Sequence, residues 1–172
     1  MKWRQIIPTA VTLAAMLSGF LSIIVTFQAA MVKTAGSVDA AVPEWCTFGT
    51  AAKLIMLAMI LDGIDGNLAR WLKGTSDFGA ELDTYVDMTA FGIAPAILIF
   101  AVSFQQTDPV WRVLLPSAVC VSGVVRLARF KIKDPLRGQG GYAGLPITAN
   151  AAWVALFVVL SQTPEHERFS LD

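Results

Sequence analysis

Five long apolar segments divide this chain of 172 residues, and they constrain its fold more than any other feature. They cover residues 6–32, 47–72, 82–104, 110–130 and 145–161. Each is close to the roughly 20 residues that a helix needs to cross the hydrocarbon core of a bilayer. A helix satisfies its own backbone hydrogen bonds in lipid, so we predict an all-α, polytopic membrane bundle with five spans.

The composition agrees with a membrane protein. Hydrophobic residues make up 55% of the chain and charged residues 15%, whereas a soluble domain has about 25% charged residues. The first apolar segment is longer than the roughly 7–15 residues of a signal-peptide core, so we interpret it as a span. No linker or repeat is visible, and we predict one domain over residues 1–172.

Lysine and arginine residues are distributed unevenly between the two sides of the predicted bundle. If the N-terminus is cytoplasmic, most of them fall on the cytoplasmic side, as the positive-inside rule requires: Lys2, Arg4, Arg70, Lys73, Arg126, Arg129, Lys131, Lys133 and Arg137. We therefore expect a protein of the inner (cytoplasmic) membrane, with the lipid bilayer as its surroundings and no nucleic-acid partner.

Four aspartates interrupt the apolar pattern near the predicted cytoplasmic ends of the second and third spans. Asp62 and Asp65 are three residues apart, and Asp83 and Asp87 are four apart. These spacings place two side chains on one face of a helix. A short turn around residues 72–79 would bring the two helices together, so we expect the four carboxylates to converge at the cytoplasmic face.

Clustered carboxylates in a partly dry site need positive charge to balance them. Two divalent cations would do so, and all-oxygen ligands favour hard ions such as Mg²⁺, Mn²⁺ or Ca²⁺. Two such ions suit displacement at phosphorus. An EF-hand loop starting at Asp62 is excluded because its twelfth position is Lys73 instead of a glutamate. A pathway for ions or protons stays open, including a divalent-cation transporter.

The residues between the aspartates complete a recognisable pattern. It reads Asp62-x2-Asp65-Gly66-x2-Ala69-Arg70-x8-Gly79-x3-Asp83-x3-Asp87. This pattern resembles the complete signature of the CDP-alcohol phosphotransferases. The resemblance implies an intramembrane enzyme, homodimeric and with a core of six spans, of which this chain shows five. An alcohol would attack the lipid-bearing phosphorus of a CDP-linked lipid, and CMP would leave.

The same resemblance implies roles for the individual residues of the pattern. Asp62, Asp65 and Asp83 would bind two Mg²⁺ or Mn²⁺ ions, and Asp87 would be both a ligand and the general base for the alcohol. Small and basic residues would line the CDP site: Gly66, Ala69, Arg70 and Gly79.

Other segments resemble the bacterial and archaeal phosphatidylserine synthases, namely residues 75–96, 124–132 and 142–149. This resemblance implies transfer of the phosphatidyl group of CDP-diacylglycerol to L-serine. Arg126, Arg129 and Lys131 are candidates to bind the serine carboxylate or the lipid phosphate, with membrane anchoring as the alternative. Other acceptors, such as glycerol phosphate, an inositol phosphate or choline, stay open.

Overall fold

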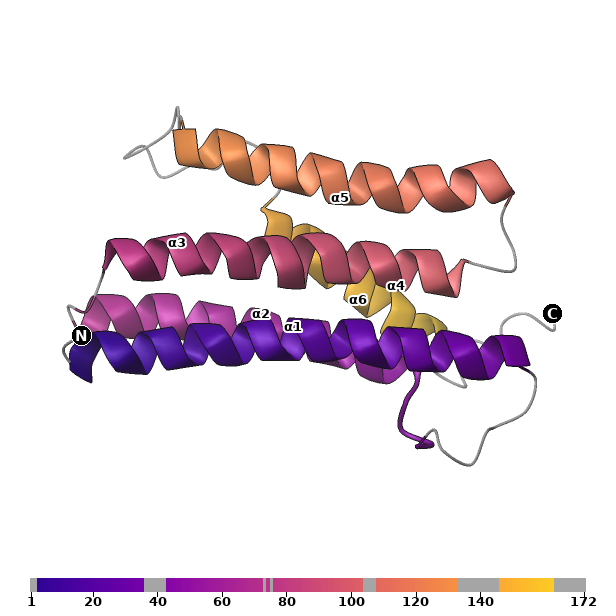
Figure 1. Cartoon of the computed structure of the whole chain (residues 1–172), viewed down its shortest axis with the longest axis horizontal. Helices are drawn as coiled ribbons and strands as arrows, with labels where there is room; N and C mark the ends of the chain where they lie inside the picture. The colour runs from indigo at the N-terminus through magenta and orange to yellow at the C-terminus, as the bar shows by residue number, and fades with distance from the viewer. Residues whose placement is uncertain are drawn as a thin grey trace.

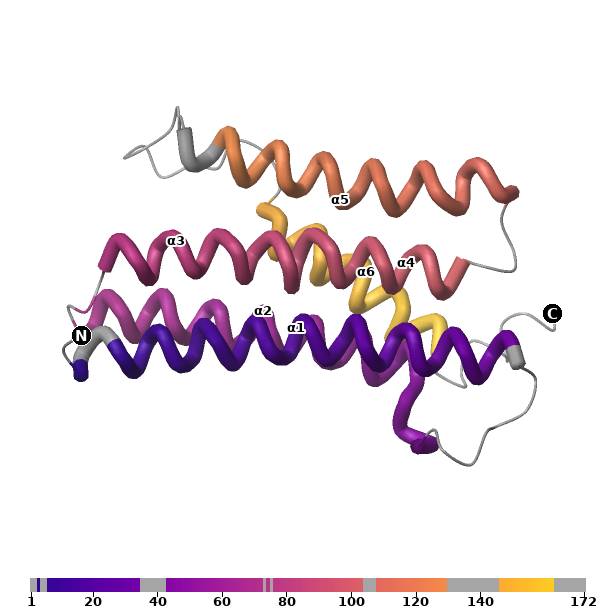
Figure 2. Tube along the Cα trace, viewed as in Figure 1, coloured from indigo at the N-terminus to yellow at the C-terminus, as the bar shows by residue number. Residues whose placement is uncertain are grey.

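The computed structural model describes residues 3–35, 43–72, 74, 76–103, 108–132 and 146–162. In these ranges every regular element is a helix, so the prediction of an all-α fold is confirmed. The elements are α1 (Trp3–Ala35), α2 (Phe48–Trp71), α3 (Asp77–Val86), the π-helix η1 (Asp87–Ile93), α4 (Ala94–Val102), α5 (Pro109–Ile132) and α6 (Ile147–Ser161). α3, η1 and α4 follow one another without a break as a single rod (Figure 2).

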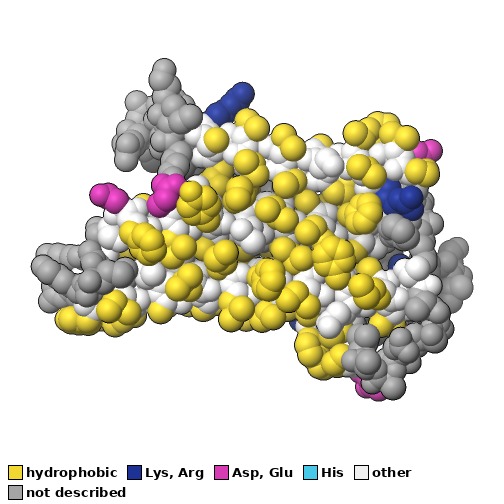
Figure 3. Space-filling model, in the orientation of Figure 1, with side chains coloured by type: hydrophobic (Ala, Val, Ile, Leu, Met, Phe, Trp, Pro, Cys, Tyr) yellow, Lys and Arg dark blue, Asp and Glu magenta, His cyan; other side chains and the backbone are white. Residues whose placement is uncertain are grey.

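Within the described residues, three helical stretches are long and apolar enough to cross a membrane: Ile6–Thr34, Asp77–Val102 and Pro109–Arg129. α6 is apolar but has only 15 residues, and α2 carries Lys53, Asp62, Asp65 and Arg70 within its 24 residues. Hydrophobic side chains cover the middle of the face in Figure 3, and the charged side chains lie toward its two ends. The protein is therefore a helical membrane protein, with three helices that meet this criterion among the described residues. The count of five spans stays a prediction, since α2 and α6 do not meet the same criterion.

α1 and α2 form the most closely packed pair of helices, and they lie side by side in Figure 1. The Ser18 hydroxyl donates to the carbonyl oxygen of Leu54, and the Ser22 hydroxyl donates to that of Ala51, both at 2.8 Å. Alanines fill the interface around these bonds, and Ala15 and Ala51 are fully buried. Small residues and interhelical hydrogen bonds are the usual means by which membrane helices approach closely. These contacts therefore fix α1 and α2 relative to each other.

The rod from α3 to α4 changes its hydrogen-bond pattern in the middle. The N–H of Ala94 donates to the carbonyl oxygen of Thr89, five residues earlier, where an α-helix would use the residue four earlier. Pro95 follows directly and has no N–H to donate. The wider turns accommodate the proline ring, and the first residue of this π-helical segment is Asp87. π-Helical turns of this kind are frequently found at functional sites.

α5 and α6 complete the bundle. α5 packs on the α4 and η1 side of the rod, and α6 crosses obliquely and packs against α2 (Figure 1). The C-terminal ends of α2 and α5 and the start of α3 gather at the end of the molecule that holds the N-terminus. The end of α4 and the start of α5 lie at the opposite end.

Candidate functional site

A tight turn joins α2 to α3 and brings the two pairs of aspartates face to face. α2 ends as the N–H of Leu72 donates to Leu68 and that of Gly74 donates to Ala69. α3 begins at Asp77, directly after its N-cap Ser76, whose hydroxyl accepts the N–H of Gly79 at 3.0 Å. A serine at this position satisfies a backbone donor that has no partner within the helix. The short connection is the one that the sequence predicts.

Three of the four aspartates lie in one cluster. Carboxylate oxygens of Asp62, Asp83 and Asp87 all lie within 4.8 Å of one another. The side chains of Asp62 and Asp83 are within hydrogen-bonding reach. Two like unit charges 4 Å apart repel by roughly 4 kcal/mol at an effective dielectric constant of 20. Three carboxylates at these distances therefore need a proton or a cation between them.

Asp65 lies beside this cluster and is only 5% exposed. The Thr12 hydroxyl, from α1, is within hydrogen-bonding reach of its carboxylate. The Oδ2 atom of Asp65 and the Oδ1 atom of Asp87 are buried and accept no hydrogen bond from the described residues. A buried carboxylate oxygen without a partner is costly, so both atoms are placed to accept a bond from a ligand.

A small pocket opens next to Asp65 and Asp83, between the start of α1, the end of α2 and the start of α3. Its volume is about 210 Å³. We call it the aspartate pocket, and its lining residues are Pro8, Thr9, Thr12, Asp65, Gly66, Ala69, Gly74, Ser76, Gly79, Ala80 and Asp83. The lining includes Gly66, Ala69 and Gly79, which the sequence singles out as a group. A Cβ atom on Gly66 would meet no atom within 4 Å, so the glycine opens onto free space.

Thr12, a residue of α1 in this pocket, was not predicted from the sequence. Thr12 is 6% exposed, and its hydroxyl donates to the carbonyl oxygen of Pro8 at 3.0 Å. The available signal was a threonine four residues after a proline, where its hydroxyl can bond to a backbone carbonyl one turn earlier. The pattern of aspartates does not reach α1, so it gave no reason to look there.

Arg70 takes a different position from that of the small residues. Its Nε atom donates to the carbonyl oxygen of Gly66 at 3.1 Å, and its Nη2 atom donates to Oδ1 of Asn67 at 3.0 Å. The guanidinium group thus lies along its own helix, and Arg70 does not contribute to the lining of the aspartate pocket.

The basic residues of α5 lie at the same end of the bundle as the aspartates (Figure 1). Arg126 is partly buried and Arg129 is exposed, and neither contributes to the aspartate pocket. Lys131 lies in the last turn of α5, and its side chain falls outside the described residues. Residues 133–145 also fall outside the described residues, and they include the first half of the segment 142–149.

The donor set suits a hard divalent cation. Asp62, Asp65, Asp83 and Asp87 offer only oxygen atoms, the ligands that Mg²⁺ and Mn²⁺ prefer. Two of these oxygen atoms are buried and have no partner among the described residues, and three of the carboxylates are close enough to share an ion. The residues present therefore fit the metal site that the spacing of the aspartates predicts.

Comparison with known proteins places these observations in a family. The family model for CDP-alcohol phosphatidyltransferase matches residues 5–169. A protein of Helicobacter pylori strain J99 named CDP-diacylglycerol–serine O-phosphatidyltransferase is 34% identical over 113 residues, which are 66% of this chain and 47% of that protein.

Proteins of the same name show the same level of similarity in distant organisms. The one from Methanocaldococcus jannaschii is 41% identical over 109 residues (62% of this chain and 49% of that protein). The one from Saccharomyces cerevisiae is 38% identical over 107 residues (58% and 38%). The chain thus spans about half the length of these relatives or less. It belongs to the CDP-alcohol phosphatidyltransferase family.

Proposed function

We propose that this chain carries the active site of a CDP-diacylglycerol–serine O-phosphatidyltransferase. The observation that carries the proposal is the convergence of Asp62, Asp83 and Asp87 within 4.8 Å, beside a pocket lined by small residues. The chain belongs to a family of the matching chemistry, and the relatives described above bear the name of this reaction.

The four aspartates are proposed to hold two divalent cations, Mg²⁺ or Mn²⁺. Asp62, Asp83 and Asp87 offer carboxylate oxygens within 4.8 Å of one another. The buried Oδ2 atom of Asp65 accepts no hydrogen bond from the described residues. When bound, the cations would neutralise the pyrophosphate and the negative charge that develops on the leaving CMP.

The aspartate pocket is proposed to receive the CDP part of the lipid substrate. Gly66, Ala69 and Gly79 leave room along the backbones of α2 and α3, so a flat group can lie against them. Thr12 closes the α1 side. Arg70 is proposed to bind phosphate at the edge of the pocket, since its planar donors match phosphate oxygens.

Asp87 is proposed to act as the general base. Its Oδ1 atom is buried and accepts no hydrogen bond from the described residues, so it is available for a proton. As the carboxylate removes the proton, the serine hydroxyl oxygen forms a bond to the phosphorus that bears the lipid. The bond between that phosphorus and the CMP oxygen breaks, and CMP leaves with the electron pair. A hydroxyl group is a weak nucleophile unless a base accepts its proton as it attacks.

The substrates are proposed to reach this site from the cytoplasmic side of an inner membrane. Arg126, Arg129 and Lys131 would bind the serine carboxylate or the lipid phosphate, because α5 ends at the same end of the bundle as the aspartates (Figure 1). Arg70, Arg126 and Arg129 all lie at this end, which supports a cytoplasmic orientation. A homodimer is proposed from the family resemblance.

The experiment that tests the proposal measures CMP release by the purified full chain. CDP-diacylglycerol is supplied with Mn²⁺ or Mg²⁺, with and without L-serine, beside glycerol phosphate, inositol phosphate and choline. Release that requires both metal and serine is the expected result. Release of CMP with another alcohol and not with serine would show that this alcohol is the acceptor. Cation uptake into vesicles without any CMP release would overturn the enzyme in favour of a transporter.

A further inference from the structure

We infer that Gly19 is a positioning residue for Asp87: its contact with Ala90 sets where the π-helical segment η1 holds this carboxylate relative to Asp62. The inference rests on the proposed function, because it concerns the metal site formed by the aspartates. Gly19 lies outside the sequence pattern of the family, on a helix that contributes no aspartate to the site.

The approach of α1 to η1 at this point is closer than any side chain on residue 19 would permit. A Cβ atom added to Gly19 would lie 2.6 Å from the Cβ atom and 2.8 Å from the Cα atom of Ala90. Favourable contacts between carbon atoms are at about 3.5–4.0 Å. Ala90 is fully buried, and the contact includes its Cα atom, so no movement of its side chain alone can relieve the overlap. A larger residue at position 19 must therefore push η1 away from α1.

α1 cannot easily yield instead, because it is fixed to α2 on both sides of Gly19. Ser18 and Ser22 each donate a hydrogen bond of 2.8 Å to a backbone carbonyl of α2. α2 also carries Asp62, eight residues beyond Leu54, the partner of Ser18. α1 is thus held against α2, the helix of Asp62, at the level where Gly19 contacts Ala90 of η1, the segment of Asp87.

Ala90 is close enough to Asp87 for a shift to reach the cluster. The two residues are three apart in η1, and Asp87 is the first residue of that segment. The N–H of Asp87 is bonded to the carbonyl oxygens of Asp83 and Thr84, which ties the segment to α3. A displacement at Ala90 therefore turns or lifts Asp87 against Asp83, within a cluster whose oxygens lie within 4.8 Å.

The test compares Mn²⁺ binding, followed by electron paramagnetic resonance, with steady-state kinetics of the full chain. Gly19→Ala is expected to weaken Mn²⁺ binding roughly 10- to 100-fold, the range found when residues that orient metal ligands are changed. It should lower kcat and leave the KM for CDP-diacylglycerol within about twofold. In the double variant Gly19→Ala/Ala90→Gly, Mn²⁺ binding should recover in part, because the 2.6 Å overlap is removed and the 2.8 Å approach to Cα is retained.

Gly49→Ala is the matched control. It places the same methyl group on α2, where the nearest atoms would lie at 3.7 and 3.8 Å, an ordinary contact distance. Mn²⁺ binding and kcat should both stay at the wild-type level. If Gly19→Ala lowers the melting temperature while its folded fraction binds Mn²⁺ as the wild type does, Gly19 is only a packing residue and the inference is wrong.

Ala90→Gly keeps the inference testable if Gly19→Ala does not fold, because it removes bulk and adds none. Ala90→Gly removes the Cβ atom through which η1 rests against Gly19, so this variant should bind Mn²⁺ more weakly than the wild type. Ala101→Gly makes the same change in a buried alanine at the far end of the rod, and it should weaken Mn²⁺ binding less. Equal binding in these two variants would overturn the inference. A wild-type protein that binds no Mn²⁺ would instead overturn the proposed metal site, and the inference would fail with it.

Discussion

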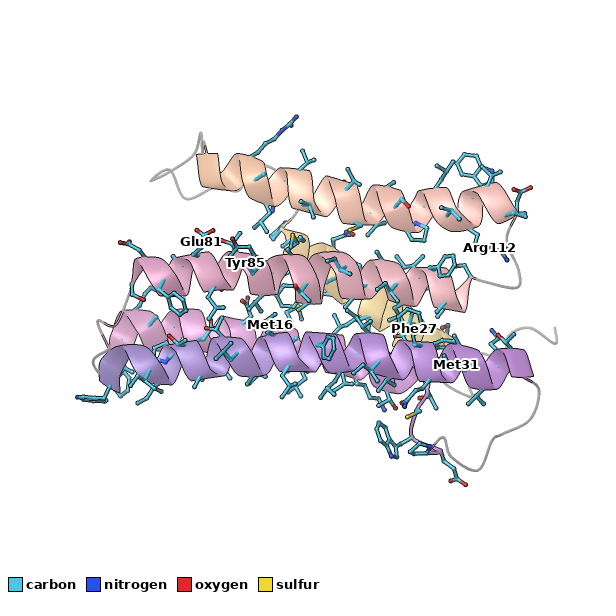
Figure 4. All side chains as sticks on the ribbon, in the orientation of Figure 1. Met16, Phe27, Met31, Glu81, Tyr85 and Arg112 are labelled. Atoms are coloured by element: carbon cyan, nitrogen blue, oxygen red, sulfur yellow. The ribbon has the colours of Figure 1, made fainter. Side chains whose placement is uncertain are left out.

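The bundle has a hollow near each end, and the smaller one holds the proposed chemistry. The aspartate pocket has a volume of about 210 Å³. An apolar groove of about 530 Å³ lies between α1, α4 and α5, toward the other end. Phe27 and Met31 of α1, which line this groove, lie far from Glu81 and Tyr85 of α3 in Figure 4.

The two hollows differ most in the polar atoms that they offer. The hydroxyl groups of Thr26, Thr34 and Ser117 line the apolar groove, and each donates to a carbonyl of its own helix at 2.7–2.8 Å. At the aspartate end, carboxylate oxygens of Asp65 and Asp87 are buried and find no partner in the part of the chain that the structure describes. Unpaired buried polar atoms, more than volume, therefore indicate where a polar ligand binds.

Asp87→Asn should have the largest effect. The amide keeps the size of the side chain but cannot accept the proton of the attacking hydroxyl group, so turnover should fall by roughly 10²–10⁴-fold, the usual contribution of a general base. Binding of CDP-diacylglycerol should be retained, since the other three aspartates are intact. CMP release and lipid binding are measured in parallel. Wild-type turnover in this variant would rule out the proposed base.

Asp62→Asn should act on the metal dependence instead. The variant removes one of three clustered carboxylates, so the Mn²⁺ concentration for half-maximal activity should rise roughly 10- to 100-fold, as for other changes that disturb metal ligands. Saturating Mn²⁺ should restore part of the activity. A metal titration that coincides with that of the wild type would show that Asp62 is not a ligand. Together with Asp87→Asn, the experiment separates two roles within one cluster.

Thr12→Val should have a smaller effect, confined to the aspartate pocket. Valine keeps the shape of the side chain and removes the hydroxyl that reaches toward Asp65 and bonds to Pro8. The KM for CDP-diacylglycerol should rise roughly three- to tenfold, the value of about one hydrogen bond. Thr34→Val, a matched change in the apolar groove, should leave the KM unchanged. Equal KM values for Thr12→Val and Thr34→Val would show that Thr12 does not contribute to substrate binding.

The sequence predicted those parts of the molecule that depend on local pattern. The apolar segment 47–72 became α2 (Phe48–Trp71), and Thr47, at the start of the segment, caps the helix by accepting the N–H of Thr50. The approach of Asp62 to Asp83 followed from helical spacing and from a turn of a few residues. Both results need only the periodicity of one helix and the length of one connection.

Features that depend on contacts between distant segments were not predicted. The π-helical turns at Asp87–Ile93 accompany Pro95 and the close approach of α1 to η1 at Gly19. Thr12 enters the site because α1 packs against the end of α2. Arg70 bonds to Gly66 and Asn67 of its own helix, a conformation that its residue type does not fix. The contacts of Gly19 and Thr12 need the position of a second helix, which no local pattern encodes.

Ser117→Leu should have the smallest effect and is the sharpest test of the difference between the two hollows. The substitution adds apolar volume to the lining of the groove and removes one hydrogen bond, from Ser117 to Val113 on the same helix. Ser117 is exposed, so the larger side chain can be accommodated without strain. The KM for CDP-diacylglycerol, kcat and the Mn²⁺ titration should all stay within about twofold of the wild type, the range expected for a surface substitution. A large rise in the KM with an unchanged Mn²⁺ titration would mean that the substrate's acyl chains extend into the apolar groove, and the two ends of the bundle would then serve one ligand.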